Sequence, residues 1–457
     1  MKLKNSLPLK LAVIVGLVLV LLIPLTMIES VVNERSTNRR VVEHDIAATW
    51  TGRQVLIGPV INVPYQVRYQ ERVWKNERGA YEEIEKLRWQ SISIMPDRLS
   101  ITGKVPVEKR YRGIYGVPVF SAELSVEGTF PAAEVDKLRT TIKGFARFGT
   151  PEFAVGIGDA RGIATIPTLD WNGDAVNFEP GSGKRDFGDG IHAPLSLANV
   201  SSATHFSLRL NLRGSKALQV VPLAGEAEVL LESPWPHPKF DGRFLPVERT
   251  VGAEGFLARW QLSSFSTNAP QLLKGCGAGQ CEPLLSSGFG VQFLETVDLY
   301  QKVTRALKYG VLFIALTFTA FLLTEALSHR QLHAMHYLLV GCALSIFYLL
   351  LVSLSEHIGF APAYFTAMLA CIGLIGIYLS GVLESARLGT VYAVGLGSLY
   401  GTLFVVLRSE DFALLMGSTL LFATLAVFML LTRRLQWRSE ALADDTPPEA
   451  VHPQGGH

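Results

Sequence analysis

The sequence has only four cysteines, almost no charge imbalance and none of the short motifs that mark common enzyme classes. A formal net charge of +2 gives no sign of the basic face that nucleic-acid binding requires. No Gly-x-Ser-x-Gly nucleophile elbow, Walker loop or His-Glu-x-x-His zinc motif occurs. Nucleic-acid binding, elbow-type hydrolysis, nucleotide-driven transport and zincin-type proteolysis are therefore not expected.

Charge is also missing from several long stretches, the first of which is Leu11–Ile28. Lysines precede this run, as they do in a secretory signal peptide or in a retained signal anchor. The polar flank Glu29–Glu34 offers no small-x-small cleavage site. We therefore predict a retained transmembrane helix over residues 11–28, with residues 1–10 in the cytoplasm.

Five more uncharged runs follow within residues 306–432, and each is long enough to cross a hydrocarbon core of about 30 Å. They lie at about 306–324, 337–355, 360–383, 388–407 and 412–431. In the short connections, Arg330, Arg387 and the arginines after residue 432 fall on the predicted inner side, against Arg408 on the outer side. This pattern predicts a multi-pass protein of a bacterial inner membrane, with residues 433–457 as a disordered cytoplasmic tail.

Residues 29–305 have a different composition, in which apolar and polar residues alternate. Phe206–Leu212, Ala122–Val126 and Ala227–Leu231 are examples, and such period-2 runs indicate half-buried antiparallel strands. The sequence thus predicts an α+β membrane protein. Its parts would be a signal-anchor helix, a large, mainly antiparallel β domain in the periplasm and a C-terminal bundle of five transmembrane helices.

Three segments of the predicted β domain depart from the strand pattern. Asn33–Trp50 is predicted to extend the first membrane helix outward as an amphipathic stalk. Pro131–Leu138 is predicted to form a short helix with Pro at its first position. Asp170–Asp189 is rich in Gly, Asn and Asp and is predicted to be a long loop.

The cysteines divide by location. Cys342 and Cys371 lie inside apolar runs, where a thiol serves as a small hydrophobic group. Cys276 and Cys281 enclose two glycines in a tight loop that a disulfide closes easily in an oxidising compartment. A disulfide is favoured over free thiols, and a metal site least of all, because no nearby histidine adds a ligand.

Two acid–base pairs are candidates for a functional role. Asp159 and Arg161 lie just beyond a predicted strand, where a structural salt bridge is the better interpretation. Glu356 and His357 lie at the outer mouth of the third span, where they could relay protons, bind a headgroup or simply cap a helix end.

Three histidines, His329, His333 and His336, are spaced to share one helix face, as metal ligands would. Histidines at a membrane interface give the same pattern, and this second interpretation is favoured, so no metal site is predicted. The spans also carry no charge near their centres, which argues against an ion-coupled carrier but leaves lipid handling open.

Several long and unusual strings resemble those of a known family. They are Leu56–Tyr65, Arg110–Val119, Gly156–Gly162, Ser233–Phe240, Val297–Gln301, Arg305–Gly310 and Leu351–Phe360. On these segments the sequence resembles the CreD family, the inner-membrane cell envelope integrity proteins. The resemblance implies a link to a two-component regulatory system, to envelope integrity, to tolerance of certain colicins and to β-lactam responses. It implies no catalytic residues.

The same strings mark the junction between the β domain and the membrane. Asp298, Tyr300, Arg305, Lys308 and Tyr309 are predicted to form a polar and aromatic collar at the bilayer surface.

We expect a non-enzymatic protein without cofactor or metal. Its β domain would bind an envelope component or a periplasmic or membrane protein partner, while its bundle contacts membrane lipids and supports envelope integrity and the stress response. A lipid or small-molecule translocator that uses the bundle is the alternative. An enzyme acting on peptidoglycan or lipid is the least supported interpretation.

Overall fold

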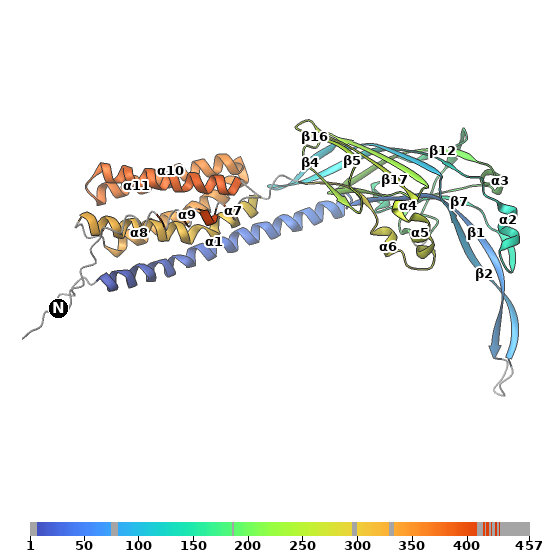
Figure 1. The fold of residues 1–457 in the computed structure, drawn as a ribbon, viewed down its shortest axis with the longest axis horizontal. Coiled ribbons are helices and arrows are strands. Elements are labelled where there is room, and N and C mark those ends of the chain that lie inside the picture. Colours follow the sequence, from blue (N-terminus) through green and yellow to red (C-terminus); the bar gives the residue numbers. More distant parts are fainter. Residues whose placement is uncertain are drawn as a thin grey trace, which may run out of the picture. The chain divides into compact units, whose positions relative to one another are not determined.

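The computed structural model describes residues 7–74, 81–184, 187–294, 299–328 and 333–408, together with a few helical positions between 415 and 429. The chain divides into two compact units. The membrane unit comprises Met1–Ser30 and Gln301–His457, and the β unit comprises Val31–Tyr300 (Figure 1).

Most helices of the membrane unit are long and apolar. They are α1 (Leu7–Thr49), whose residues from Val31 onward belong to the β unit, the short polar helix α7 (Leu299–Lys308), α8 (Gly310–Ser328), α9 (Ala334–Ile358), α10 (Phe360–Val382) and α11 (Ala386–Arg408). Within the described residues, 5 segments have the length and composition to cross a membrane, and one of them joins α7 to most of α8. The remaining predicted span, 412–431, and the tail, 433–457, lie mostly or wholly outside the described residues.

Close helix contacts in the membrane unit use small residues. Leu21, Leu25 and Ile28 are buried and share one face of α1, where Leu21 fits against Gly341 of α9. A Cβ atom at Gly389 of α11 would lie only 2.9 Å from the carbonyl oxygen of Gly376 on α10. Glycine at both positions therefore lets the two backbones approach, as helix association in lipid favours.

The β unit consists of two sheets that enclose one core. Sheet A has the order β10 (Glu179–Pro180), β11 (Gly190–Pro194), β7 (Glu152–Ile157), β1 (Gln54–Trp74), β13 (Ala217–Val221), β18 (Phe289–Phe293) and β15 (Pro238–Gly242), and β2 (Tyr81–Ile94) and β6 (Phe145–Phe148) also pair with β1. Sheet B has the order β16 (Glu248–Gly252), β17 (Gly255–Ser263), β14 (Glu226–Ser233), β3 (Arg98–Lys104), β5 (Tyr115–Phe130), β12 (Thr204–Ser215), β8 (Thr168–Trp171) and β9 (Asp174–Asn177), and β4 (Val107–Arg112) pairs with β5.

Most strand pairs are antiparallel; the described exceptions are the pairs of β1 with β13 and of β14 with β3. Alternate residues of each strand point inward, so that Phe206, Leu208 and Leu210 of β12 are fully buried. Aromatic rings from both sheets meet in the core, where Phe153 of β7 lies 5.2 Å from Phe206 between ring centroids. The predicted fold class is confirmed in its N-terminal helix, its mainly antiparallel β domain and four C-terminal apolar helices.

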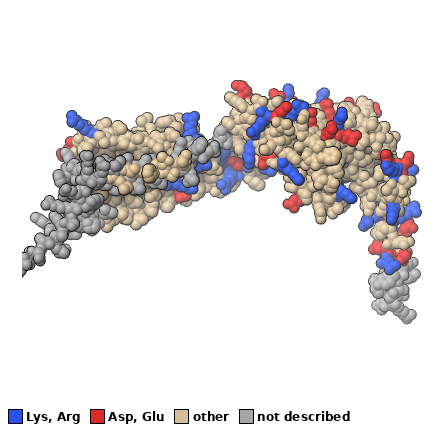
Figure 2. All heavy atoms as spheres, in the orientation of Figure 1, with Lys and Arg blue, Asp and Glu red and all other residues tan. Residues whose placement is uncertain are grey.

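Charged side chains are distributed unevenly between the β unit and the membrane unit. In Figure 2, acidic and basic side chains gather over the β unit, whereas most of the described surface of the membrane unit is uncharged. Only the apolar surface can face hydrocarbon, because a charge at the centre of a bilayer is costly.

Two local predictions were wrong. The short helix α2 spans Val135–Thr141 and does not start at Pro131, since Glu134, directly before it, has a ψ of 67°, outside the helical range. The segment predicted as a long loop contains the β8–β9 hairpin and β10. Asn172 and Gly173 both have positive φ, which is the requirement of the two-residue turn that joins twisted strands.

The short helices α5 (Ala269–Gly277) and α6 (Glu282–Leu285) cover part of the outer side of sheet A. The helix α4 (Ser264–Thr267) follows β17 of sheet B, and α3 (Leu197–Val200) lies elsewhere in the unit. Leu273 of α5 and Leu284 of α6 pack on Ile57 and Val221 of the sheet. In the structure a disulfide joins Cys276 to Cys281 at the connection between α5 and α6.

Candidate functional site: the polar face of sheet B and the end of the stalk

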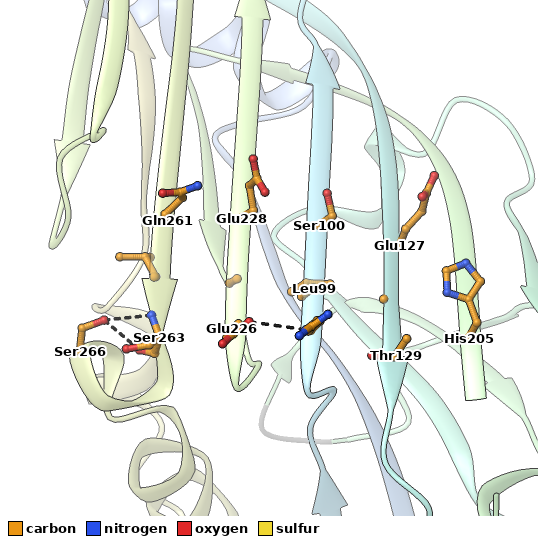
Figure 3. A pocket seen from close by; sticks show the side chains of 14 residues that line it. Leu99, Ser100, Glu127, Thr129, His205, Glu226, Glu228, Gln261, Ser263 and Ser266 are labelled. Atoms are coloured by element: carbon orange, nitrogen blue, oxygen red, sulfur yellow. Dashed lines mark hydrogen bonds and ion pairs between the residues drawn. The ribbon is translucent and has the colours of Figure 1, made fainter. Parts of the chain in front are cut away.

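The outer face of sheet B carries an open hollow of about 780 Å³, here called the basin. Its lining comes from five strands and from α4: Arg98, Leu99, Ser100, Glu127, Gly128, Thr129, His205, Glu226, Ala227, Glu228, Gln261, Leu262, Ser263 and Ser266. Figure 3 shows Gln261, Glu228, Ser100 and Glu127 side by side on adjacent strands.

Strand register explains this row of polar side chains. Glu228 of β14 pairs with Ser100 of β3, and Ser100 pairs with Glu127 of β5. The next residues along these strands, Val229, Ile101 and Val126, point the other way into the core. Burial of the apolar face therefore fixes which polar groups face outward, since a shift by one residue would reverse every side chain.

Charges within the basin are partly paired. Arg98 lies 3.6 Å from Glu226, and Arg259, beside the basin, lies 2.7 Å from Glu228. The hydrogen bond to Glu228 raises the pKa of Arg259 above its usual value. Glu127 accepts a hydrogen bond from the Ser125 hydroxyl at 3.0 Å and forms no ion pair within the part of the chain that the structure describes.

The basin offers carboxylates, hydroxyl groups, an amide and an imidazole on neighbouring strands whose other face packs into the core. Among the described residues, no serine of the basin donates a hydrogen bond to His205, as a nucleophile with its base would. Such a platform can recognise a polar ligand or a polar partner surface through several simultaneous hydrogen bonds.

The predicted pair Asp159–Arg161 lies elsewhere, at the end of the stalk, by which we mean residues 31–49 of α1. Arg161 is part of the 3₁₀ turn η1 (Ala160–Gly162), and its Nη2 lies 2.6 Å from Asp159 Oδ2. Its Nη1 donates to the carbonyl oxygen of Ala48 at 3.1 Å. The hydrogen bonds from Arg161 hold the pKa of Asp159 below its usual range, although partial burial opposes them. The pair thus holds the last turn of the stalk helix.

Further side chains hold the same helix end. Two guanidinium groups lie near the ring of Trp50, that of Arg110 at 3.7 Å and that of Arg213 at 5.1 Å from the ring centroid. The buried side chain of Gln54 donates to the carbonyl oxygens of Asp159 and Arg213. These contacts fix the position at which the stalk enters sheet A as β1.

A second group of ion pairs joins the side of the stalk to the sheets. Lys216, in the turn between β12 and β13, reaches Glu43 at 2.9 Å, and Arg112 of β4 reaches Asp45 at 2.6 Å. Glu43 also accepts from Arg39 at 3.1 Å. Surface pairs of this kind contribute little individually, but together they determine the orientation of the helix on the domain.

The other described candidates lie on α7 and α9. Glu356 is half-buried and His357 is exposed, in the last turn of α9 before Gly359. Of the collar, Asp298 lies outside the described residues, Tyr300 is buried, and Arg305 and Lys308 lie in the last turn of α7. Basic side chains in the last turn of a helix interact favourably with the negative end of the helix dipole.

The predicted histidine cluster is only partly described, because His329 lies outside the described residues. The rings of His333 and His336 are 6.1 Å apart, and Nδ1 of His336 is 2.8 Å from the Tyr378 hydroxyl. Within the described ranges there is no group of three or more His, Cys, Asp or Glu residues that could hold a metal ion.

Sequence reasoning missed the basin and most of the stalk contacts. The signal for the basin was present, because the outward positions of the alternating runs Ala122–Val126 and Ala227–Leu231 include glutamates. No such signal was present for Trp50 and Lys216, because their partners are far away along the chain and only the fold brings them together.

Comparison with known proteins is consistent with this architecture. A sequence model of the family described as "Inner membrane protein CreD" matches residues 6–438. The protein named "Inner membrane protein CreD" of Escherichia coli (strain K12) is 36% identical over 445 residues, which cover 96% of this chain and 96% of that protein. With its membrane-length helices, this protein is a multi-pass inner membrane protein, and the chain belongs to the CreD family.

Proposed function

We propose that this protein is a non-enzymatic binding protein of the inner membrane. Its β unit faces the periplasm and binds an envelope component or a protein partner at the basin, and the membrane helices anchor it. This role would support envelope integrity and the stress response. The observation that carries the proposal is the basin itself, a hollow of about 780 Å³ whose polar lining is held on five strands.

The charge distribution supports the proposed orientation. Basic residues flank the spans mainly on the side that the short connections share with the N-terminus, and this side is cytoplasmic in most inner membrane proteins. A domain between the first span and the second then lies on the opposite, periplasmic side.

Site-directed photocrosslinking in intact cells tests the proposal with the full-length protein. A photoreactive residue at Ser100 or Gln261, in the basin, should give one discrete adduct with a partner protein or envelope polymer. The same residue at Lys143, which is exposed in the turn before β6, serves as the matched control and should give none. Equal adducts at all three positions, or none at Ser100 and Gln261, would contradict the proposal.

A further inference from the structure

A second open hollow lies on sheet A and shares no residue with the basin. It has a volume of about 740 Å³, and its walls come from β2, from β6 with the segment that follows it, and from the segment between β11 and α3. Figure 1 shows β2 and α3 at the same end of the β unit. We propose that this hollow, here called the tryptophan site, binds a saccharide chain that carries carboxylate groups.

Strand register places a tryptophan beside a guanidinium group in the tryptophan site. Trp89 of β2 pairs with Gln66 of β1, and Gln66 pairs with Arg147 of β6, so the three side chains share one face of the sheet. Arg147 Nε donates to Gln66 Oε1 at 2.8 Å. The guanidinium carbon of Arg147 lies 5.7 Å from the centroid of the Trp89 ring. These contacts hold the cation next to the indole.

The indole ring is supported on one side and open to solvent. Trp89 is 51% exposed, although a tryptophan ring gains more from burial than most side chains do. Gly149 lies against the edge of the ring, where a Cβ atom would crowd Cζ3 of Trp89 at 3.1 Å. Glycine therefore lets the backbone support the ring closely. An exposed aromatic ring held in this way is typical of the anchor residues of binding sites.

The charge of Arg147 is not balanced by the residues around it. Arg147 forms no ion pair with any residue that the structure describes, and the described lining of the site contains no carboxylate. Glu152, which follows the lining residue Pro151, interacts with Asn62 and His192 instead. The terminal guanidinium nitrogens are thus available to a ligand, and such a group binds a carboxylate through two parallel hydrogen bonds.

The main chain of the tryptophan site favours a saccharide over a peptide. An extended peptide that adds to a sheet needs free backbone N–H and C=O groups. Pro151 and Pro194 have no N–H to offer. The N–H of Gly149 is bonded to the carbonyl oxygen of Pro64, and the N–H of Leu195 is bonded to that of Pro151. Side chains therefore provide most of the recognition.

A saccharide matches the side chains that are present. The apolar C–H face of a sugar ring stacks on an indole, and its hydroxyl groups bond to the indole N–H and to the exposed Thr150 hydroxyl. A carboxylate on the sugar pairs with Arg147. The volume of about 740 Å³ lies within the range of roughly 300–1,000 Å³ that is usual for ligand sites, so more than one sugar ring fits.

Calorimetric titration of the purified full-length protein in phosphatidylcholine nanodiscs tests the site. The probes are tetragalacturonate and the neutral maltotetraose, at equal ionic strength. We expect saturable binding of tetragalacturonate and weaker binding of maltotetraose. Trp89→Ala removes the stacking surface and should weaken the binding of both by about tenfold or more, whereas Trp89→Phe should retain most of it. Arg147→Gln should reduce the affinity for tetragalacturonate to that for maltotetraose and leave the latter unchanged.

Two exposed residues elsewhere on the β unit provide matched controls. Tyr111 is 68% exposed on β4, and Arg249 is exposed on β16 and forms no ion pair within the described part of the chain. Tyr111→Ala and Arg249→Gln should bind both probes as the wild type does. The result is independent of crosslinking at the basin, because the two sites share no residue.

Tetraglutamate, which carries its carboxylates on a peptide, separates the two classes of ligand. It should bind much more weakly than tetragalacturonate. Binding of tetraglutamate with equal affinity would identify an acidic-peptide site and overturn the saccharide assignment. Heats of tetragalacturonate that do not saturate, or an unchanged affinity in Trp89→Ala, would overturn the proposal as a whole.

Discussion

Arg161 donates a hydrogen bond from Nη1 to the carbonyl oxygen of Ala48 at 3.1 Å, and so ties a turn after β7 to the last turn of α1. The final carbonyl groups of a helix have no partner within the helix and carry its partial negative charge. The Arg161 guanidinium group gives one of these carbonyl groups a hydrogen-bond donor and places a positive charge beside the negative end of the helix. Asp159 holds the guanidinium group in position at 2.6 Å.

The Asp159 carboxylate should make a pH-dependent contribution to the stability of the β unit. Because its pKa is lowered in the folded protein, the contribution is present above its usual pKa of 3.8 and disappears as the pH falls through the lower folded value. Asp159→Asn should therefore lower the thermal unfolding midpoint at pH 7 but much less at acidic pH. Glu254→Gln, in an exposed turn, is the control; an equal deficit of Asp159→Asn at every pH would contradict this account.

Two buried tyrosines of the membrane unit form a matched pair of variants. The Tyr364 hydroxyl donates to the carbonyl oxygen of Tyr400 at 2.6 Å, whereas the buried Tyr348 hydroxyl has no hydrogen-bond partner in the described part of the chain. Tyr364→Phe should cost roughly 1 kcal/mol of unfolding free energy. Tyr348→Phe should cost nothing or stabilise the protein, because it removes an unsatisfied polar group. Unfolding in mixed micelles measures both, and the opposite order would refute the assignment.

The disulfide between Cys276 and Cys281 should stabilise the β unit. It closes a short loop, and restricting so short a loop in the unfolded chain is worth about 2 kcal/mol. Tryptophan fluorescence during urea unfolding reports this change, since Trp437 is the one tryptophan outside the β unit. Replacing both cysteines by alanine, or adding a reductant, should lower the midpoint by the same amount. Cys342→Ala should leave the response to reductant unchanged.

The double variant Glu356→Ala/His357→Ala separates binding from translocation. If function resides in the β unit, this variant should complement a deletion strain as well as the wild type does. A loss of complementation at normal membrane levels would instead favour a translocator that uses the bundle. Immunoblotting of membrane fractions provides the control for protein level.

Local periodicity predicted the regular parts of the fold. The alternating runs at 122–126, 206–212 and 227–231 lie within β5, β12 and β14, and the four apolar runs between residues 306 and 407 lie largely in α8 to α11. Burial explains this success, since one face of a strand or the whole surface of a membrane helix must be apolar. The β8–β9 hairpin was missed because a composition rich in Gly, Asn and Asp was interpreted as a loop, although Asn-Gly is itself a turn signal.

The candidate sites were harder to predict, for a different reason. Asp159 and Arg161 are neighbours in sequence, but their contact with Ala48 depends on a hydrogen bond between residues more than a hundred positions apart. The basin likewise requires the parallel pairing of β14 with β3, which no local pattern indicates. Long-range pairing of this kind is decided by the fold as a whole.

The position of β18 has a consequence for biogenesis. This strand lies between β13 and β15 in sheet A, and β1 pairs in parallel with β13 although Gln54 and Leu218 are far apart in the chain. Sheet A therefore stays incomplete until Phe293 has been synthesised, only a few residues before α7 begins at Leu299. At about 5–20 residues per second, the early strands wait many seconds for their partners. Such exposed, slowly completed edges are prone to aggregation, so with the proposed periplasmic location we expect this unit to depend on chaperones during export.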